Sequence, residues 1–424
     1  MNKLRNGIFK KCGALPKSNL FYWMKLFKLF KHIIQKRIKI KFNKLQNINI
    51  LVFDGVSNPD LEFLLEEFDF IVLENRFERI KEINLSPKTI FKLMENFLNL
   101  ILKRKNVSLS NLYFYTIIKL IKPKVVITSI DNSLQFHQLA KLLHNEIVFF
   151  AIQNANRLDY LNNEYNMKNN LSNIDYNSQL FIPNFFWFGD IEEKLAKKLN
   201  LKIKNFFKYG SIRSANFFCY AKKEKLNLSK NLYDICLISE LVFGFNKKYR
   251  KNYIEEGLGI VASYTIKFAI EKNLKLIFAS KYPGGNRWHN EELEFYKKYL
   301  SKEEFNYLIG NLNKNKNKFS SYFAIFQSNV AVGCQSTLLR DKIGLREKIL
   351  SCNLTDYKNY NFPIDGICTI NNCNYDEFSS RLNKILEIDS HNYFKNLNPD
   401  LVMMFDENIS MLDRIKLKIR ENLY

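Results

Sequence analysis

The stretch KPKVVITSIDNSLQFHQLAKLLHNEIVFFAIQNANR, residues 122–157, decides the fold. It runs from an apolar segment through a polar turn, a helical pattern and a second apolar segment to a second polar turn. This succession is typical of a strand–helix–strand unit with parallel strands. Ligands of such sheets bind at the polar turns that follow the strands. The turns here are 129–132 and 153–157.

The same alternation continues on both sides of this unit. Further apolar runs predict strands at 48–55, 69–74, 185–190, 206–214, 233–241, 274–281, 329–332 and 348–350, with helical patterns between most of them. The sequence therefore predicts an α/β fold of two doubly wound, Rossmann-like domains that face a cleft. We expect a basic amphipathic N-terminal segment (1–46), a first domain (47–220), a polar linker (221–231), a second domain (232–392) and a helical C-terminal tail (393–424).

Positive charge is concentrated at the start of the chain. The 424 residues carry a net charge of +23, and residues 1–50 hold 13 Lys or Arg and no acid. Part of the excess reflects a composition rich in Lys, Asn and Ile, which is typical of AT-rich genomes. Residues 20–42 predict a helix with aromatic side chains on one face and lysines on another. Such a helix contacts an anionic membrane surface, or alternatively docks on its own domain.

Several classes of protein are disfavoured. Seven cysteines form no CxxC pair and five histidines form no HExxH motif, so we expect reduced structural thiols and no metal site. No apolar stretch approaches the ~18–20 residues that span a bilayer. We expect a cytoplasmic protein, with attachment to the inner face of the cytoplasmic membrane as the alternative. Nucleic acid is not an expected partner, because no recognised binding module accompanies the basic residues.

The polar turns of the first domain supply candidate acceptor-side residues. Asp131 and His137 are candidate catalytic bases, although Asp131 alternatively caps a helix and His137 alternatively is a half-buried structural histidine. The candidate substrate-binding residues are Asn132, Gln153, Asn154, Arg157, Ser211 and Arg213. Both arginines are alternatively structural ion-pair partners.

The second domain supplies candidate donor-side residues. In VGCQSTLLRDKIG (332–344), a strand ends and a helix begins at two hydroxyl side chains, which suits either an N-cap or a phosphate site. The candidates in this domain are Ser239, Glu240, Lys281, Arg287, Ser336 and Thr337. GxGxxG, P-loop and GxSxG motifs are all missing, which disfavours a dehydrogenase and a serine hydrolase. Cations and helix-end amides suit group transfer from a phosphate-bearing donor.

Five of these stretches resemble the two-domain GT-B glycosyltransferases and, more narrowly, bacterial surface-carbohydrate biosynthesis proteins. They are 130–141, 151–157, 209–214, 233–239 and 320–344, and the resemblance covers about residues 48–390. It implies that Ser336 and Thr337, with Gln335 beside them, bind the donor phosphate. It also implies that Asp341 holds a donor hydroxyl, where a glutamate is more usual, and that catalysis needs no bound metal or cofactor. Ala155 replaces the glycine that often follows the Gln-Asn turn.

The leading hypothesis is a glycosyltransferase that moves a sugar from a nucleotide-sugar to a lipid-linked or growing surface glycan, as in capsule or lipopolysaccharide synthesis. One alternative is a CDP-polyol phosphotransferase of surface polymer synthesis, which uses the same cleft. Another is a non-catalytic, membrane-associated scaffold of glycan biosynthesis.

Overall fold

The computed structural model describes residues 35, 38–76, 79–102, 108–156, 180–198, 201–226, 228, 231–241, 252–282, 284–286, 288–355, 357–406 and 409–424. The chain divides into two compact units. One comprises residues 1–58 and 69–126, and the other comprises residues 59–68 and 127–424.

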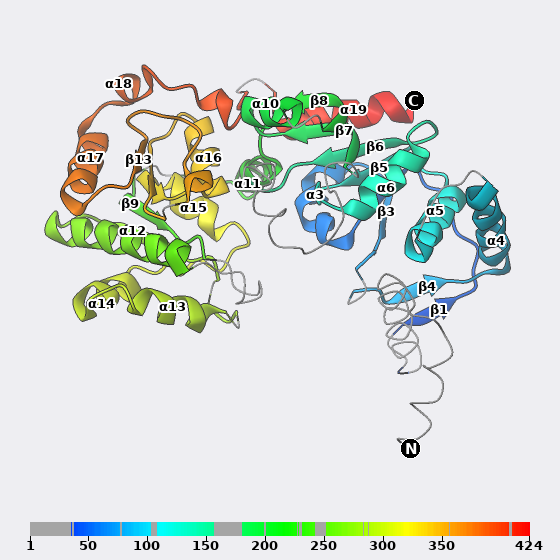
Figure 1. Cartoon of the computed structure of the whole chain (residues 1–424), viewed down its shortest axis with the longest axis horizontal. Helices are drawn as coiled ribbons and strands as arrows, with labels where there is room; N and C mark the ends of the chain where they lie inside the picture. The colour runs from blue at the N-terminus through cyan, green and yellow to red at the C-terminus, as the bar shows by residue number, and fades with distance from the viewer. Residues whose placement is uncertain are drawn as a thin grey trace, which may run out of the picture. The chain divides into compact units, whose positions relative to one another are not determined.

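Two large sheets organise the chain (Figure 1). The strand order is β3-β2-β5-β6-β7-β8 in the first and β10-β9-β11-β12-β13 in the second. In both, the second strand in sequence lies on one side of the first strand and the third lies on the other. This is the order of flavodoxin-like doubly wound sheets. The predicted class, α/β with two Rossmann-like sheets, is confirmed, whereas the cleft and the domain boundaries stay predictions.

In the first unit, the buried strand β2 packs against the helix α5. The elements are β1 (Lys39–Lys41), β2 (Ile50–Phe53), the 3-10 turn η1 (Gly55–Ser57), β3 (Phe70–Leu73), β4 (Glu82–Asn84), α4 (Pro87–Leu102), α5 (Leu109–Ile121) and the start of β5 (Val125–Thr128). Every residue of β2 is apolar and buried, as expected for a strand covered on both faces. The ring of Phe53 meets that of Phe114 edge-on at 6.0 Å.

The second unit begins with the remaining strands of the first sheet. Its elements there are α3 (Asn58–Leu65), α6 (Leu134–Leu143), β6 (Val148–Ile152), β7 (Phe181–Trp187), α10 (Asp190–Lys198), β8 (Lys202–Lys208) and α11 (Ile212–Lys223). Strands β7 and β8 are parallel and pair Phe186 with Phe207. Their rings stack at 5.0 Å, and those of Trp187 and Phe206 stack at 4.4 Å. Aromatic pairs therefore join these neighbouring strands.

The second sheet lies entirely in the second unit and all its pairings are parallel. Its elements are β9 (Tyr233–Ile238), α12 (Asn252–Glu271), β10 (Leu276–Ala279), α13 (His289–Lys297), α14 (Lys302–Gly310), α15 (Ser320–Phe326), β11 (Ser328–Gly333), α16 (Thr337–Gly344), β12 (Ile349–Asn353), η3 (Lys358–Tyr360) and β13 (Thr369–Asn371). It is followed by α17 (Tyr375–Glu387), α18 (Ser390–Phe394), η4 (Pro399–Leu401) and α19 (Met411–Leu423).

Right-handed crossovers place α12 on one face of the second sheet and α15 and α16 on the other, and α17, which follows the last strand, packs beside α12. The packing agrees, because α12 contacts α17 while α15 contacts α16 (Figure 1). Both faces are covered, so the strands are almost wholly buried. The carboxyl ends of the strands are then the place where polar groups can meet a ligand.

Some local predictions differ from the structure. The strands predicted at 185–190 and 206–214 begin earlier, at Phe181 and Lys202. The first residues of the predicted linker continue α11 as far as Lys223. The helix predicted over 20–42 falls mostly outside the described residues. Its end is wrong, because Lys39–Lys41 form β1, which pairs with β4 and places Lys41 2.5 Å from Glu82.

Three further observations concern the sequence expectations. Of the helices in the described residues, none combines the length and the apolarity required to cross a membrane. Cys352 and Cys373, whose Sγ atoms lie 3.9 Å apart, form no disulfide. Within the described part of the chain, no three His, Cys, Asp or Glu side chains gather closely enough to hold a metal ion.

Candidate functional site

At the carboxyl edge of the second sheet, a carboxylate of the chain lies between the ends of β9 and β11, where doubly wound sheets commonly bind ligands. Strands β9 and β11 are neighbours, so the residues after them meet at the carboxyl edge. Glu240, after β9, accepts hydrogen bonds from the amides of Cys334 (2.5 Å) and Gln335 (3.0 Å), after β11. A Cβ at Gly333 would lie 2.7 Å from Oε1 of Glu240, which explains the glycine. Amides that suit an anionic ligand are thus already engaged.

Opposing effects act on the pKa of the Glu240 carboxyl. The residue is half buried, and burial raises the pKa of its carboxyl, while the amides of residues 334–336 and the charge of Lys281 oppose the shift. A carboxyl whose pKa is raised is more easily neutralised, and a neutral carboxyl is a weaker acceptor for these amides.

The hydroxyls of Ser336 and Thr337 contact different partners at the start of α16. Ser336 is the N-cap and accepts a hydrogen bond from the amide of Leu338 (3.3 Å). Thr337 Oγ1 accepts from the amide of Asn156 (3.1 Å), which follows β6 of the first sheet. The N-cap is therefore observed, and a phosphate at this helix end stays a prediction.

A buried polar cluster joins the strand-end turns of the two sheets. Arg340 of α16 and Glu192 of α10 form an ion pair at 2.6 Å, and each side chain is only 1% exposed. Arg340 also donates to Oδ1 of Asn156 (3.2 Å), whose Nδ2 lies 3.3 Å from Oε1 of Gln335. Gln153 donates to Glu192 (3.1 Å). The predicted residues Gln153, Gln335 and Thr337 are thus brought together.

Arg340, Glu192 and Asn156 are the members of this cluster that the sequence analysis missed. Arg340 lies in the quoted stretch 332–344, between the apolar Leu339 and the buried Ile343. The available signal was a run of three charged residues, Arg340, Asp341 and Lys342, enclosed by apolar ones, because charged side chains that become buried are normally paired.

Asp341 is buried beside the start of α11. Its side chain accepts a hydrogen bond from the hydroxyl of Tyr322 (2.9 Å), and the residue is 1% exposed. Burial raises the pKa of the Asp341 carboxyl to about 6, and hydrogen bonding from Ser211 and Tyr322 opposes this rise. Ser211 is also the N-cap of α11 and accepts from the amide of Ser214. Contact of Asp341 with a donor hydroxyl stays a prediction.

The predicted residue Arg213 forms an ion pair. Its Nε lies 3.0 Å from Oδ1 of Asp60, on α3. Ser129, in the turn after β5, donates to the other carboxylate oxygen of Asp60 at 3.0 Å. This contact agrees with the alternative interpretation of Arg213 as a structural ion-pair partner.

Ser239 belongs to a separate buried cluster around Glu292. The Glu292 carboxylate, which is fully buried, accepts from the hydroxyls of Ser239 and Ser280 and from the amides of Lys281 and Tyr282. The side chain of Lys281 is exposed. This cluster fixes the turn after β10 and keeps Lys281 near the edge of the sheet.

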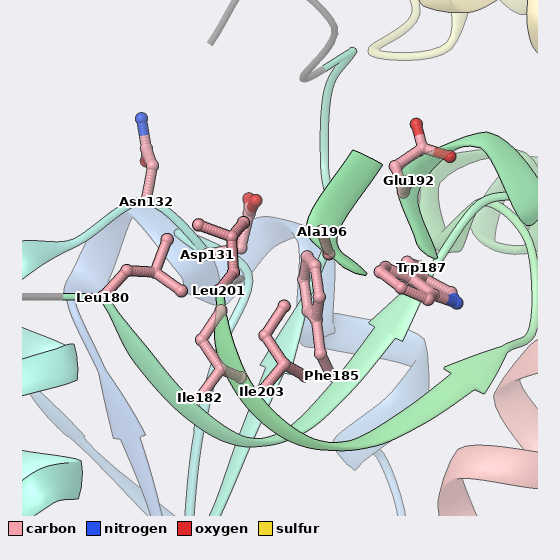
Figure 2. A pocket seen from close by; sticks show the side chains of 10 residues that line it. All are labelled: Asp131, Asn132, Leu180, Ile182, Phe185, Trp187, Glu192, Ala196, Leu201 and Ile203. Atoms are coloured by element: carbon pink, nitrogen blue, oxygen red, sulfur yellow. The ribbon is translucent and has the colours of Figure 1, made fainter. Parts of the chain in front are cut away.

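A pocket lies beside β7 and β8, between these strands, α10 and the turn that follows β5 (Figure 2). Its volume is about 400 Å³ when the space open to solvent is included. It is lined by Asp131, Asn132, Leu180, Ile182, Phe185, Trp187, Glu192, Ala196, Leu201 and Ile203. In Figure 2 the polar ends of Asp131, Asn132 and Glu192 lie on one side, and apolar side chains such as Ile182 and Ile203 lie on the other.

His137, in α6, is fully buried. Its Nδ1 is 3.3 Å from the carbonyl oxygen of Phe181, and its Nε2 meets no partner among the described residues. Burial lowers the pKa of His137 to about 4, against the opposing charge of Asp131. The ring is therefore neutral near pH 7. Of the two predicted catalytic residues, Asp131 lines the pocket and His137 does not.

Arg157 and Arg287 lie outside the described residues. Asn154 is half buried in the turn after β6.

No protein-family model matches the sequence, and no curated protein matches it. Among solved structures, a UDP-GlcNAc 2-epimerase from Neisseria meningitidis bound to UDP-GlcNAc is similar at TM-score 0.49 and 9% identity, over 91% of this chain and 100% of that chain. Arabidopsis thaliana UGT89C1 complexed with UDP is similar at 0.43 and 11%, over 88% and 100%. The wall teichoic acid polymerase TagF is similar at 0.40 and 10%, over 96% and 98%. Because each TM-score is below 0.5, the function proposed below rests on the residues of this chain.

Proposed function

We propose that the chain is a glycosyltransferase that takes a sugar from a nucleotide-sugar donor and adds it to a growing or lipid-linked surface glycan. One observation carries the proposal. Asn156, after a strand of the first sheet, hydrogen-bonds Thr337 and Gln335, after a strand of the second. Polar strand-end turns of two doubly wound sheets therefore meet at the start of α16, and such edges are where these sheets bind ligands.

In this proposal the donor and the acceptor occupy different sheets. The donor diphosphate binds at the start of α16, where Ser336, Thr337 and the helix amides face it, and Lys281 supplies positive charge. The acceptor enters the pocket beside β7, where Asp131 accepts the proton of the attacking hydroxyl. The predicted residue Asn132, which lines this pocket, positions the acceptor in this proposal.

The test is a thermal-shift screen of the full chain against UDP-, GDP-, CMP- and CDP-linked sugars, CDP-linked polyols and the free nucleotides. A ligand that binds the folded state raises its melting temperature by mass action. We expect one nucleotide class to raise it, and the double variant Ser336→Ala/Thr337→Ala to lose most of that rise relative to its own ligand-free value. Ser380→Ala, an exposed serine of α17, is the control and keeps the rise. An equal rise in the double variant would refute the donor site.

A second candidate is a non-catalytic scaffold. The observation in its favour is that Glu240 already occupies the amides of Cys334 and Gln335. If no nucleotide shifts the melting temperature of the folded chain, this carboxylate permanently replaces a ligand and the scaffold is preferred. A shift with CDP-polyols alone instead favours the polyol phosphotransferase.

A further inference from the structure

Helix α4 exposes most of its large apolar side chains and buries two of its polar ones. The large apolar side chains on its exposed face are Ile90, Phe91, Met94, Phe97, Leu98 and Leu102, of which 46% to 80% is exposed. On the other side, Thr89 and Asn96 are only 1% and 4% exposed. Asn96 donates a hydrogen bond to Thr116 of α5 at 3.1 Å. A surface helix of a globular protein normally shows the opposite pattern.

The helix forms without burying this apolar face. Ser86 is followed by Pro87 at the first helical position, and its hydroxyl accepts the amide of Thr89 at 3.2 Å. Local capping and packing against α5, which includes the Asn96–Thr116 hydrogen bond, hold α4 in place. Phe91, Met94, Leu98 and Leu102 recur every three or four residues, so they form one continuous stripe along the helix. Contiguous apolar surface of this kind marks a contact with something other than water.

The charge of the surrounding unit identifies the chemistry of the partner. Among the described residues of the unit that contains α4 (35, 38–58, 69–76, 79–102 and 108–126), 11 are Lys or Arg and 5 are Asp or Glu. The acid of α4, Glu95, is paired with Lys92 at 2.6 Å, and Lys88 is exposed. An apolar helix face within a basic unit complements an anionic bilayer surface, where lysines meet lipid phosphates.

We propose that α4 is a membrane-docking helix that lays Phe91, Met94, Leu98 and Leu102 into the interface of an anionic leaflet. The inference goes beyond the proposed function, because it assigns a surface far in sequence from the candidate donor residues and needs no nucleotide. It is also separate from the predicted helix over residues 20–42.

The test is co-sedimentation of the full chain with vesicles of phosphatidylcholine, with and without phosphatidylglycerol. We expect binding to the anionic vesicles, weakened by high salt as screening requires. Phe91→Gln/Leu98→Gln removes two apolar side chains while keeping good helix formers, and we expect it to lower the bound fraction about ten-fold. The control Phe405→Gln/Leu417→Gln changes two side chains that are 41% and 50% exposed outside this unit, and it keeps wild-type binding.

Three results would overturn the proposal. One is normal vesicle binding by the α4 variant together with loss of binding when residues 1–34 are deleted, which assigns the membrane contact to that segment. A second is a dimer in light scattering that the α4 variant makes monomeric, with no vesicle binding by the wild type. A third is equal binding by the wild type, the variant and the control. The nucleotide-induced melting shift is measured in parallel, so a failure of docking is distinct from a failure of the proposed function.

Discussion

The carboxyl edges of the two sheets differ in how their polar groups are satisfied. At the second sheet, Glu240 and Glu292 accept backbone amides from the turns after β11 and β10, so the edge is hydrogen-bonded within itself. At the first sheet, Asp131 and Asn132 line an open pocket, with apolar side chains beside them. The first sheet therefore has a pocket beside its strand-end turn, whereas a ligand at the second edge must compete with a carboxylate of the chain. The cluster around Arg340 connects the strand-end turns of the two sheets by an ion pair and hydrogen bonds.

The largest effect is expected from removing the ion pair between Arg340 and Glu192. Arg340→Ala leaves Glu192 buried without its ion-pair partner, and we expect a loss of about 3–5 kcal/mol in the free energy of unfolding. Arg346→Ala is the control, because its pair with Asp400 is exposed (46% and 37%) and should change the free energy by at most about 1 kcal/mol. Urea denaturation followed by circular dichroism measures both. Similar values for the two variants would show that the cluster contributes little to joining the edges.

The next largest effect concerns Asp131, which lines the pocket of the first sheet. Asp131→Asn keeps the shape of the pocket but removes the proposed base, so kcat should fall by about 10²–10⁴-fold in a sugar-transfer assay with the donor class found by the screen. Asp69→Asn, an exposed carboxylate outside the pocket, should leave kcat unchanged. Because Asp131 is buried, the melting temperature of the variant is measured as well. Full activity in a folded Asp131→Asn protein would exclude this residue as the base.

The regular elements of both edges were predictable because they depend on local patterns. Apolar runs bounded by polar turns identified β2, β5, β6, β9, β10, β11 and β12. Helix α14 had a signal that was overlooked, since Ser301 and Glu304 form a capping box. Strand β13 is three residues long, and its pairing with β12 is set by the sheet rather than by its composition.

The partners of the polar side chains were not predictable, because they join residues far apart in sequence. Glu240 meets Cys334 across 94 residues, and Asn156 meets Thr337 across 181. The sequence placed both glutamate and hydroxyls at strand ends, but only the strand order of the folded sheet brings them together. The burial of Asp341 follows from Tyr322 and α11, which the local pattern of α16 does not reveal.

A smaller effect concerns Asp341, at the closed edge. Its carboxyl pKa is about 6 in the folded chain and 3.8 as an ordinary aspartate, so the folded state binds this proton more tightly than the unfolded state. The resulting stability is fully present below about pH 4 and is lost as the pH rises through about 6. We expect the free energy of unfolding to fall by about 1–1.5 kcal/mol between about pH 5 and pH 8 from this group alone.

Asp341→Asn tests this pH dependence, because an amide does not titrate. Urea denaturation at both pH values should show a smaller decrease for Asp341→Asn than for the wild type. Asp413→Asn, which alters an acid at the start of α19, should keep the wild-type decrease. If the wild type and Asp341→Asn lose the same stability, the buried carboxyl does not titrate in this range.

An effect of similar size concerns Glu240, and it tests the comparison of the two edges directly. If a donor phosphate displaces this carboxylate from the amides of Cys334 and Gln335, Glu240→Gln removes a competing negative charge and keeps an oxygen that accepts the amides. Nucleotide affinity should then rise about ten-fold by calorimetry, equivalent to about 1.4 kcal/mol. Wild-type affinity should also rise as the pH falls, since a neutral Glu240 competes less, and the variant should lose that dependence. Unchanged or weaker binding by the variant would instead mean that Glu240 organises the donor site, and the second edge would then be a preformed site.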